Sequence, residues 1–220
     1  MNEVQTQITN VTGKTVTEGG NVTLKCLAEG NPTPTVMWTR LSDNSVVTMP
    51  LTNIRRQNAS VGYRCTANNG VKSPATRDVF LDVQYKPDHV SLNMSITNKV
   101  CTGMAVTFTC SAGAAKPAIQ NYTLYKFVAG LTYISSNQFG IFNQILETGG
   151  QHIYRCEARN SPGYTSSSNR TLEVHVPALV KIENDTIVVL EGRNVTLYCF
   201  SSGFPSPNVS WLDNTVKEVA

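Results

Sequence analysis

The sequence has little charge, few aromatic residues and no long apolar run. Charged residues make up 15% and aromatic residues 8% of the 220 residues, whereas 40% are hydrophobic. This is the composition of a globular chain, because disordered segments carry more charge and fewer apolar residues. No run of about 18 apolar residues occurs, so we expect no membrane-spanning helix.

Clusters of basic residues and closely spaced cysteines are also missing. The net charge is +3, and the longest basic run is the pair Arg55-Arg56. This excludes a nucleic-acid-binding arm and a polybasic membrane patch. The six cysteines are too few for a knottin-like scaffold, and none of them form a C-x-x-C pair.

Motifs for catalysis and cofactor binding are absent as well. The chain contains no G-x-S-x-G nucleophile elbow, no Gly-rich phosphate loop and no dinucleotide fingerprint. His89, His152 and His175 have no metal-ligand spacing with another histidine, cysteine or carboxylate. We therefore expect no enzyme activity, no cofactor and no metal, and a surface or structural role for each histidine.

Glycosylation motifs, in contrast, are abundant. N-x-S/T sequons occur nine times, which is about twice the number expected from the composition. This density favours a secreted or cell-surface protein. The asparagines are Asn10, Asn21, Asn58, Asn93, Asn121, Asn169, Asn184, Asn194 and Asn208.

Three eleven-residue segments end in a cysteine and share one pattern. Valine lies ten residues before the cysteine, glycine seven before, valine four before, and leucine or phenylalanine two before. The alternation toward the cysteine predicts a half-buried strand, and the glycine suits a turn. The segments lie 84 and 89 residues apart, about one small domain each. They are Val16–Cys26, Val100–Cys110 and Val189–Cys199.

Further motifs follow these cysteines. A tryptophan lies twelve residues after the first and third cysteines, each time after a G-x-P-x-P turn. Two later cysteines each end a Tyr-Arg-Cys run, 39 and 46 residues after the first and second cysteines. The residues are Trp38, Trp211, Tyr63, Cys65, Tyr154 and Cys156.

The combination Cys…Trp…Tyr-x-Cys resembles the immunoglobulin superfamily. The two cysteine intervals are similar to those of short I-set or C2-type domains, and the chain resembles hemicentin-like and other adhesion proteins. The resemblance covers nearly the whole chain. It implies an all-β fold of tandem immunoglobulin-like β-sandwiches, the third incomplete. The implied domains are residues 1–86 (I-set/C2 type), 87–176 (C2-like) and 177–220 (the front half of a third domain).

The resemblance also implies the disulfides and the core. It pairs Cys26 with Cys65 and Cys110 with Cys156. It places tryptophan between the two sheets of a sandwich and a tyrosine beside the second cysteine, its hydroxyl bonding to upstream backbone. In the second copy leucine replaces the tryptophan. The core residues are then Trp38, Leu124, Trp211, Tyr63 and Tyr154.

Cys101 and Cys199 are left unpaired. Cys199 is the first cysteine of the third copy, and we expect its partner strand beyond Ala220. The first ten residues do not form a signal peptide, so we expect an internal fragment of a longer ectodomain. For Cys101 three alternatives stay open: a free thiol, a bridge to another chain or missing segment, and a bond with Cys199.

The resemblance implies an extracellular binding module from a cell-adhesion or cell-surface recognition protein. Its partners would be proteins, bound homophilically or heterophilically, and not nucleic acids. Membrane anchoring would need sequence outside these residues. The alternatives are the ectodomain of a signalling receptor of the tyrosine kinase or phosphatase type, and a structural repeat protein of the extracellular matrix.

Overall fold

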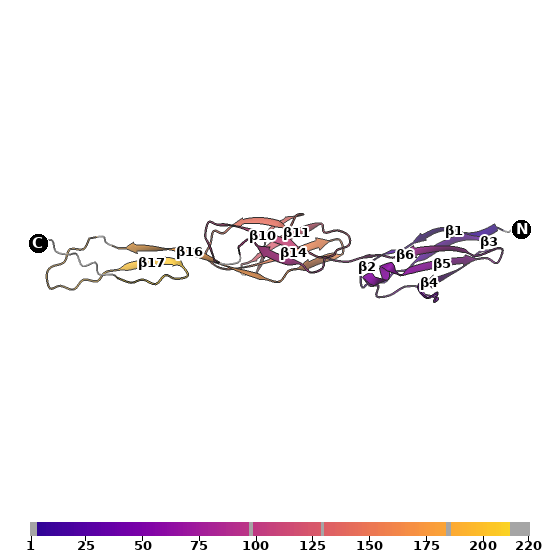
Figure 1. Ribbon diagram of the computed structural model, residues 1–220, viewed down its shortest axis with the longest axis horizontal. Helices are drawn as coiled ribbons and strands as arrows, with labels where there is room; N and C mark the ends of the chain where they lie inside the picture. Colours follow the sequence, from indigo (N-terminus) through magenta and orange to yellow (C-terminus); the bar gives the residue numbers. More distant parts are fainter. Residues whose placement is uncertain (1–3, 97–98, 129, 184–185, 212–220) are drawn as a thin grey trace. The chain divides into compact units, whose positions relative to one another are not determined.

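The computed structural model describes residues 4–96, 99–128, 130–183 and 186–211. Within these residues the regular elements are β-strands, apart from one short 3-10 helix, η1 (Arg56–Ser60) (Figure 1). The fold is therefore all-β, as the resemblance to immunoglobulin domains implies.

The first sandwich contains seven strands. β1 and β3 form an antiparallel pair, β2 and β7 form a parallel pair, and β4, β5 and β6 form an antiparallel sheet in that order. The strands are β1 (Val4–Thr12), β2 (Thr15–Thr17), β3 (Lys25–Asn31), β4 (Thr35–Arg40), β5 (Gly62–Asn68), β6 (Ala75–Phe80) and β7 (Asp82–Gln84).

Apolar residues at alternate positions along these strands form the core of the first sandwich. Val22 and Leu24, from the first repeated segment, are buried in one cluster with Trp38 and Tyr63. On β4 and β5, Trp38 lies opposite Cys65, so both belong to the inward face of this sheet. The structure thus buries the tryptophan and tyrosine that the repeat singled out.

The second sandwich consists of a three-stranded sheet, β13-β10-β8, and a larger sheet, β12-β11-β14-β16. β9 pairs with β16 and β15 pairs with β14. The strands are β8 (Ser91–Met94), β9 (Val100–Cys101), β10 (Ala105–Ser111), β11 (Asn121–Phe127), β12 (Leu131–Asn137), β13 (Ile141–Ile145), β14 (Gly150–Asn160), β15 (Gly163–Ser166) and β16 (Arg170–Ile182).

The core of the second sandwich contains three buried aromatic rings, those of Phe108, Phe142 and Tyr154, and a buried leucine. Leu124, in the position of the missing tryptophan, is fully buried. Phe108 and Tyr154 are also buried, and their ring centroids lie 4.4 Å apart. The Tyr154 hydroxyl lies 3.5 Å from Nδ1 of His152. This hydroxyl thus forms its hydrogen bond with a neighbouring ring, whereas the resemblance implies one with upstream backbone.

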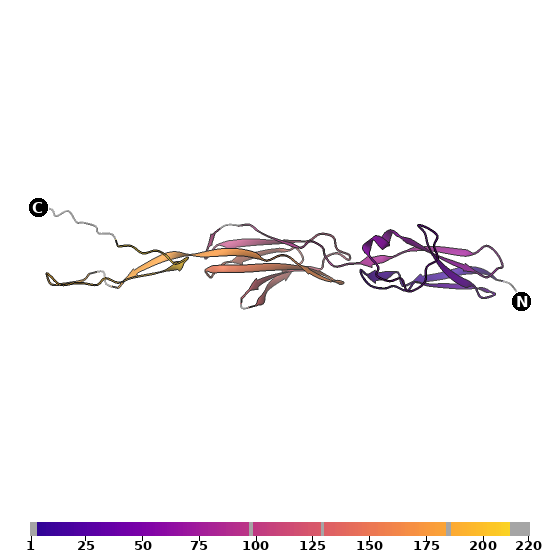
Figure 2. The ribbon, with the colours of Figure 1, turned by 90° about the horizontal axis from the view of Figure 1, so that it is seen from below.

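The third repeat departs from the predicted pattern. Residues 186–198 contain no strand, although the alternation over Val189–Cys199 predicts one. Instead β17 (Cys199–Phe204) pairs with the extended end of β16 (Figures 1 and 2). Trp211, predicted to be a core residue, is 53% exposed, which corrects that prediction. Among the described residues only the β16–β17 ribbon forms here, so no second sheet encloses the indole.

The chain divides into two compact units whose limits differ from the predicted domain boundaries. The first comprises Met1–His89, Ala112–Asn121 and Ala158–Thr165. The second comprises Val90–Ser111, Tyr122–Glu157 and Ser166–Ala220.

Hydrogen bonds of the segment after β7 explain why two later loops join the first unit. The amide N–H groups of Tyr85 and Lys116 each donate to the other residue's carbonyl. Asn160 Nδ2 also donates to the Tyr85 carbonyl, over 2.8 Å. The predicted boundary after residue 176 lies inside β16. The three domain ranges therefore stay predictions.

Candidate functional site

Two disulfides each join strands of different sheets. Cys26 on β3 bonds to Cys65 on β5, with the Cα atoms 6.4 Å apart. Cys110 on β10 bonds to Cys156 on β14, with the Cα atoms 6.1 Å apart. Intradomain disulfides of this kind persist in oxidising compartments, so they support an extracellular location.

The other two cysteines are free. Cys101 is exposed on β9, and Cys199 is half-buried at the start of β17. The alternative of a Cys101–Cys199 bond is therefore not realised in the structure. A bridge from Cys101 to another chain stays a prediction.

The sequon asparagines lie mostly on the surface. Asn58 and Asn121 are half-buried, and Asn184 lies outside the described residues. The Oδ1 atom of Asn58 accepts a hydrogen bond from the backbone amide of Arg55. The Nδ2 atom of Asn58, to which a glycan would be attached, takes no part in that hydrogen bond. Occupancy of the sequons stays a prediction. The exposed ones are Asn10, Asn21, Asn93, Asn169, Asn194 and Asn208.

The outward side of the β4–β5–β6 sheet combines apolar and charged side chains. We call it the β4–β5–β6 face. Met37 and Phe80 are 47% and 55% exposed there. Between them Arg64 forms a two-point ion pair with Asp78, at 2.6 Å and 2.8 Å. The strand register places these groups together, because Arg64 pairs with Asp78 and the neighbouring pairs are Gly62–Phe80 and Thr66–Met37.

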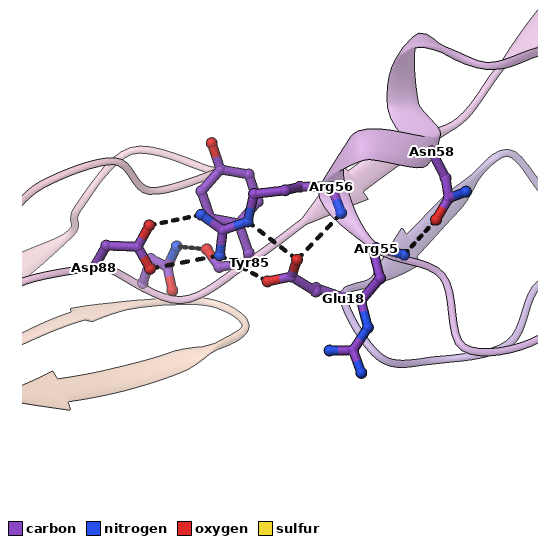
Figure 3. Close-up of polar contacts among 7 residues, drawn as sticks. Glu18, Arg55, Arg56, Asn58, Tyr85 and Asp88 are labelled. Atoms are coloured by element: carbon purple, nitrogen blue, oxygen red, sulfur yellow. Dashed lines mark hydrogen bonds and ion pairs between the residues drawn. The ribbon is translucent and has the colours of Figure 1, made fainter.

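A second charged cluster surrounds Arg56 of η1 (Figure 3). Its guanidinium contacts a Glu18 carboxylate oxygen at 2.7 Å and an Asp88 carboxylate oxygen at 2.6 Å. It also lies 4.0 Å from the centroid of the Tyr85 ring, a cation–π contact. Arg56 thereby holds the segment that follows β7 against η1. The cluster has a structural role, because its charges satisfy one another.

This cluster predicts acid sensitivity of the first sandwich. Hydrogen bonds from Arg56 lower the pKa of Glu18 from 4.5 to about 2. Because the folded-state pKa is depressed, the stabilising contribution is complete above pH 4.5 and is lost as the pH falls toward 2. We expect Glu18→Gln to lower the unfolding temperature of the first sandwich at pH 7 but not at pH 2, measured by calorimetry.

Glu29 provides a control for this prediction. It is exposed on β3 and forms no ion pair among the described residues. Glu29→Gln should leave the unfolding temperature unchanged at both pH values. An equal loss at pH 2 and pH 7 in Glu18→Gln would contradict the electrostatic origin of the effect.

Sequence reasoning missed two side chains of the second sandwich. It assigned His152 only a surface or structural role and did not single out Lys126. Both lie two residues from a core residue on the same strand, Tyr154 and Leu124 respectively. The period-2 alternation therefore indicates their inward position, and the structure places both in one cavity.

Within the described ranges, no three histidine, cysteine or acidic side chains come together as a metal site would require. No helix in the described part of the chain is long and apolar enough to span a membrane.

Comparisons with known proteins agree with this architecture. Two models of the immunoglobulin domain match residues 3–69 and 89–176. IgLON family member 5 of Homo sapiens is 34% identical over 77% of this chain, and the match covers 53% of that protein. Hemicentin-2 of Mus musculus is 30% identical over 90% of this chain. The chain spans only 4% of the length of hemicentin-2.

Among solved structures, the chain matches the N-terminal Ig1-2 module of the Drosophila receptor protein tyrosine phosphatase DLAR. It is 21% identical, covers 77% of this chain and 98% of its own, and has a TM-score of 0.32. The family models, the relatives and the two disulfides together indicate a non-enzymatic, extracellular recognition module. With both family models covering its two sandwiches, the chain belongs to the immunoglobulin superfamily.

Proposed function

We propose that the chain is part of a cell-adhesion or cell-surface recognition protein and that the β4–β5–β6 face binds a protein partner. The observation that carries this proposal is the make-up of that face. Methionine, aromatic residues and arginine are enriched at protein interfaces, and Met37, Phe80 and Arg64 supply all three types.

The distribution of sequons supports the same face. In the first sandwich Asn10 lies on β1, Asn21 lies before β3, and Asn58 lies in η1. The strands β4, β5 and β6 contain no sequon asparagine. Glycans on the three sites would thus be attached outside this sheet, and the one on Asn10 would lie at its β6 edge, because Asn10 and Asp78 line one pocket.

A single substitution tests the face by attaching a glycan to it. Met37→Asn creates a sequon with Trp38 and Thr39, and Met37 is exposed on the outward side of β4. We expect beads coated with the variant, secreted from glycosylating cells, to lose aggregation or cell binding at least tenfold relative to the unsubstituted chain. A bulky glycan there would block the approach of a partner.

Gln7→Asn is the matched control. It creates a sequon with Ile8 and Thr9 on β1, in the two-stranded β1–β3 sheet, where Gln7 is exposed. Beads with this variant should bind like the unsubstituted chain, and gel mobility should show a glycan on both variants. Equal binding by both variants would exclude the β4–β5–β6 face. No self-association and no cell binding by the unsubstituted chain would overturn the adhesion role.

The receptor ectodomain and the matrix repeat protein remain as alternatives. Both would use the same kind of module, and the described residues favour neither.

A further inference from the structure

One end of the core in the second sandwich contains polar side chains. On β11 Leu124 is fully buried, and Lys126 lies on the same inward side. On β14 Tyr154 and His152 are 2% and 7% exposed. From the opposite sheet, Gln144 follows buried Phe142 at the alternate position of β13. Lysine and glutamine are rarely found on the inward side of a sandwich, so this position needs an explanation.

The side chains of Lys126, Gln144, His152 and Tyr154 line a cavity of about 270 Å³. Ile134 and Leu146 form its apolar wall. The volume is close to the lower limit of roughly 300 Å³ for small-ligand pockets and suits one sugar ring better than a longer chain. The polar lining consists of Lys126, Gln144, Glu147, Thr148, His152 and Tyr154.

The polar groups of the cavity are only partly satisfied. His152 uses both ring nitrogens, with the Thr148 hydroxyl at 3.3 Å and the Tyr154 hydroxyl at 3.5 Å. The side chain of Lys126 forms no ion pair or hydrogen bond with any residue that the structure describes. Burial lowers the pKa of Lys126, and burial together with the charge of Lys126 lowers the pKa of His152. A negative group beside Lys126 would offset this cost.

The first sandwich offers an internal comparison. Arg40 lies two residues after Trp38, as Lys126 lies two residues after Leu124, and it also lines a cavity, together with Tyr63. There, however, Arg40 forms an ion pair with Asp43 at 3.2 Å. The residue two before Tyr63 is valine, where the second sandwich has His152. The second sandwich therefore keeps the cation, but no described carboxylate forms an ion pair with it, although Glu147 lines the same cavity.

We propose that this cavity binds a monosaccharide that bears a carboxylate, a sialic or uronic acid. Lys126 would pair with the carboxylate, and Gln144 and Thr148 would hydrogen-bond to ring hydroxyls. Ile134 and Leu146 would contact the ring carbons. Glu147 at the exposed rim would repel a bare anion, but it accepts hydrogen bonds from hydroxyl groups. This site lies in the other sandwich from the β4–β5–β6 face and does not depend on the function proposed for that face.

The test is an NMR titration of the isotope-labelled 220-residue chain with four probes. Glucuronic acid and N-acetylneuraminic acid distinguish the two sources of the carboxylate. Glucose supplies the ring without the carboxylate, and acetate supplies the carboxylate without the ring. We expect saturable shifts of the His152 ring signals with at least one acidic sugar, and at least tenfold weaker binding of glucose and acetate.

Substitutions locate the binding. Lys126→Met keeps the length of the side chain and removes its charge, so acidic-sugar binding should weaken at least tenfold. Arg40→Met is the matched control in the first sandwich and should leave binding unchanged. If Lys126→Met fails to fold, Gln144→Leu provides the second variant, with an expected loss of severalfold through one missing hydrogen bond.

The outcomes separate a sugar site from a simple anion site. Acetate that binds as tightly as the acidic sugars would overturn the sugar assignment. Absence of saturable shifts with both acidic sugars would overturn the site. Neither result affects the interpretation of the Met37→Asn experiment, because that experiment tests a surface of the first sandwich.

Discussion

Replacing Cys110 and Cys156 together by alanine is expected to lower the free energy of unfolding of the second sandwich by about 4 kcal/mol. The disulfide joins residues 46 positions apart, so its loss restores the conformational entropy of a long loop to the unfolded chain. Single domains have total stabilities of roughly 5–15 kcal/mol. The second sandwich should therefore lose a large share of its stability, while the first keeps its own disulfide.

Differential scanning calorimetry checks this result, because the two sandwiches need not unfold together. Cys101→Ser is the matched control, since Cys101 is exposed and free. It should leave both unfolding transitions in place. A double variant whose second-sandwich transition moves no further than that of Cys101→Ser would show that the disulfide contributes little to stability.

Phe108→Ala is expected to destabilise the second sandwich by about 3–5 kcal/mol. Phe108 has no exposed surface, and its ring packs against Tyr154 at a centroid distance of 4.4 Å. The substitution removes the apolar contacts of the ring and leaves a cavity that the surrounding strands cannot fully close.

Urea denaturation followed by tyrosine fluorescence and circular dichroism measures the change. Phe139→Ala is the matched control, since Phe139 is 82% exposed, and it should stay within about 0.5 kcal/mol of the unsubstituted chain. Equal effects of the two substitutions would contradict the assignment of Phe108 to the core.

The third repeat shows where reasoning from sequence reached its limit. The alternation before Cys199 is as regular as that before Cys26 and Cys110, yet only the first two copies bury their apolar residues. Alternation predicts which residues share one side of a strand. Burial of that side also requires an opposite sheet, and the described residues around Trp211 provide none.

The candidate sites show a related limit. The inward position of Lys126 follows from the alternation along β11. That Lys126 has no ion-pair partner among the described residues does not follow from the sequence pattern. In the first sandwich Asp43 pairs with Arg40, and no spacing rule predicts that Lys126 forms no ion pair with any described residue. The ion pair between Arg64 and Asp78 likewise depends on how β5 and β6 align, over a separation of fourteen residues.

The sequence by itself determined the all-β class, the repeated sandwich and the buried positions of Trp38, Tyr63, Leu124 and Tyr154. Period-2 alternation predicts the strands. The sandwich and its core residues are what the resemblance to immunoglobulin domains implies, and that resemblance is carried by the intervals between cysteine, tryptophan and tyrosine. Only the tertiary structure decided that Trp211 is exposed, that Met37 and Phe80 flank an ion pair, and that Lys126 and His152 share a cavity. The physical reason is that strand register and the pairing of sheets bring these groups together, and neither is encoded in the spacing along a single strand.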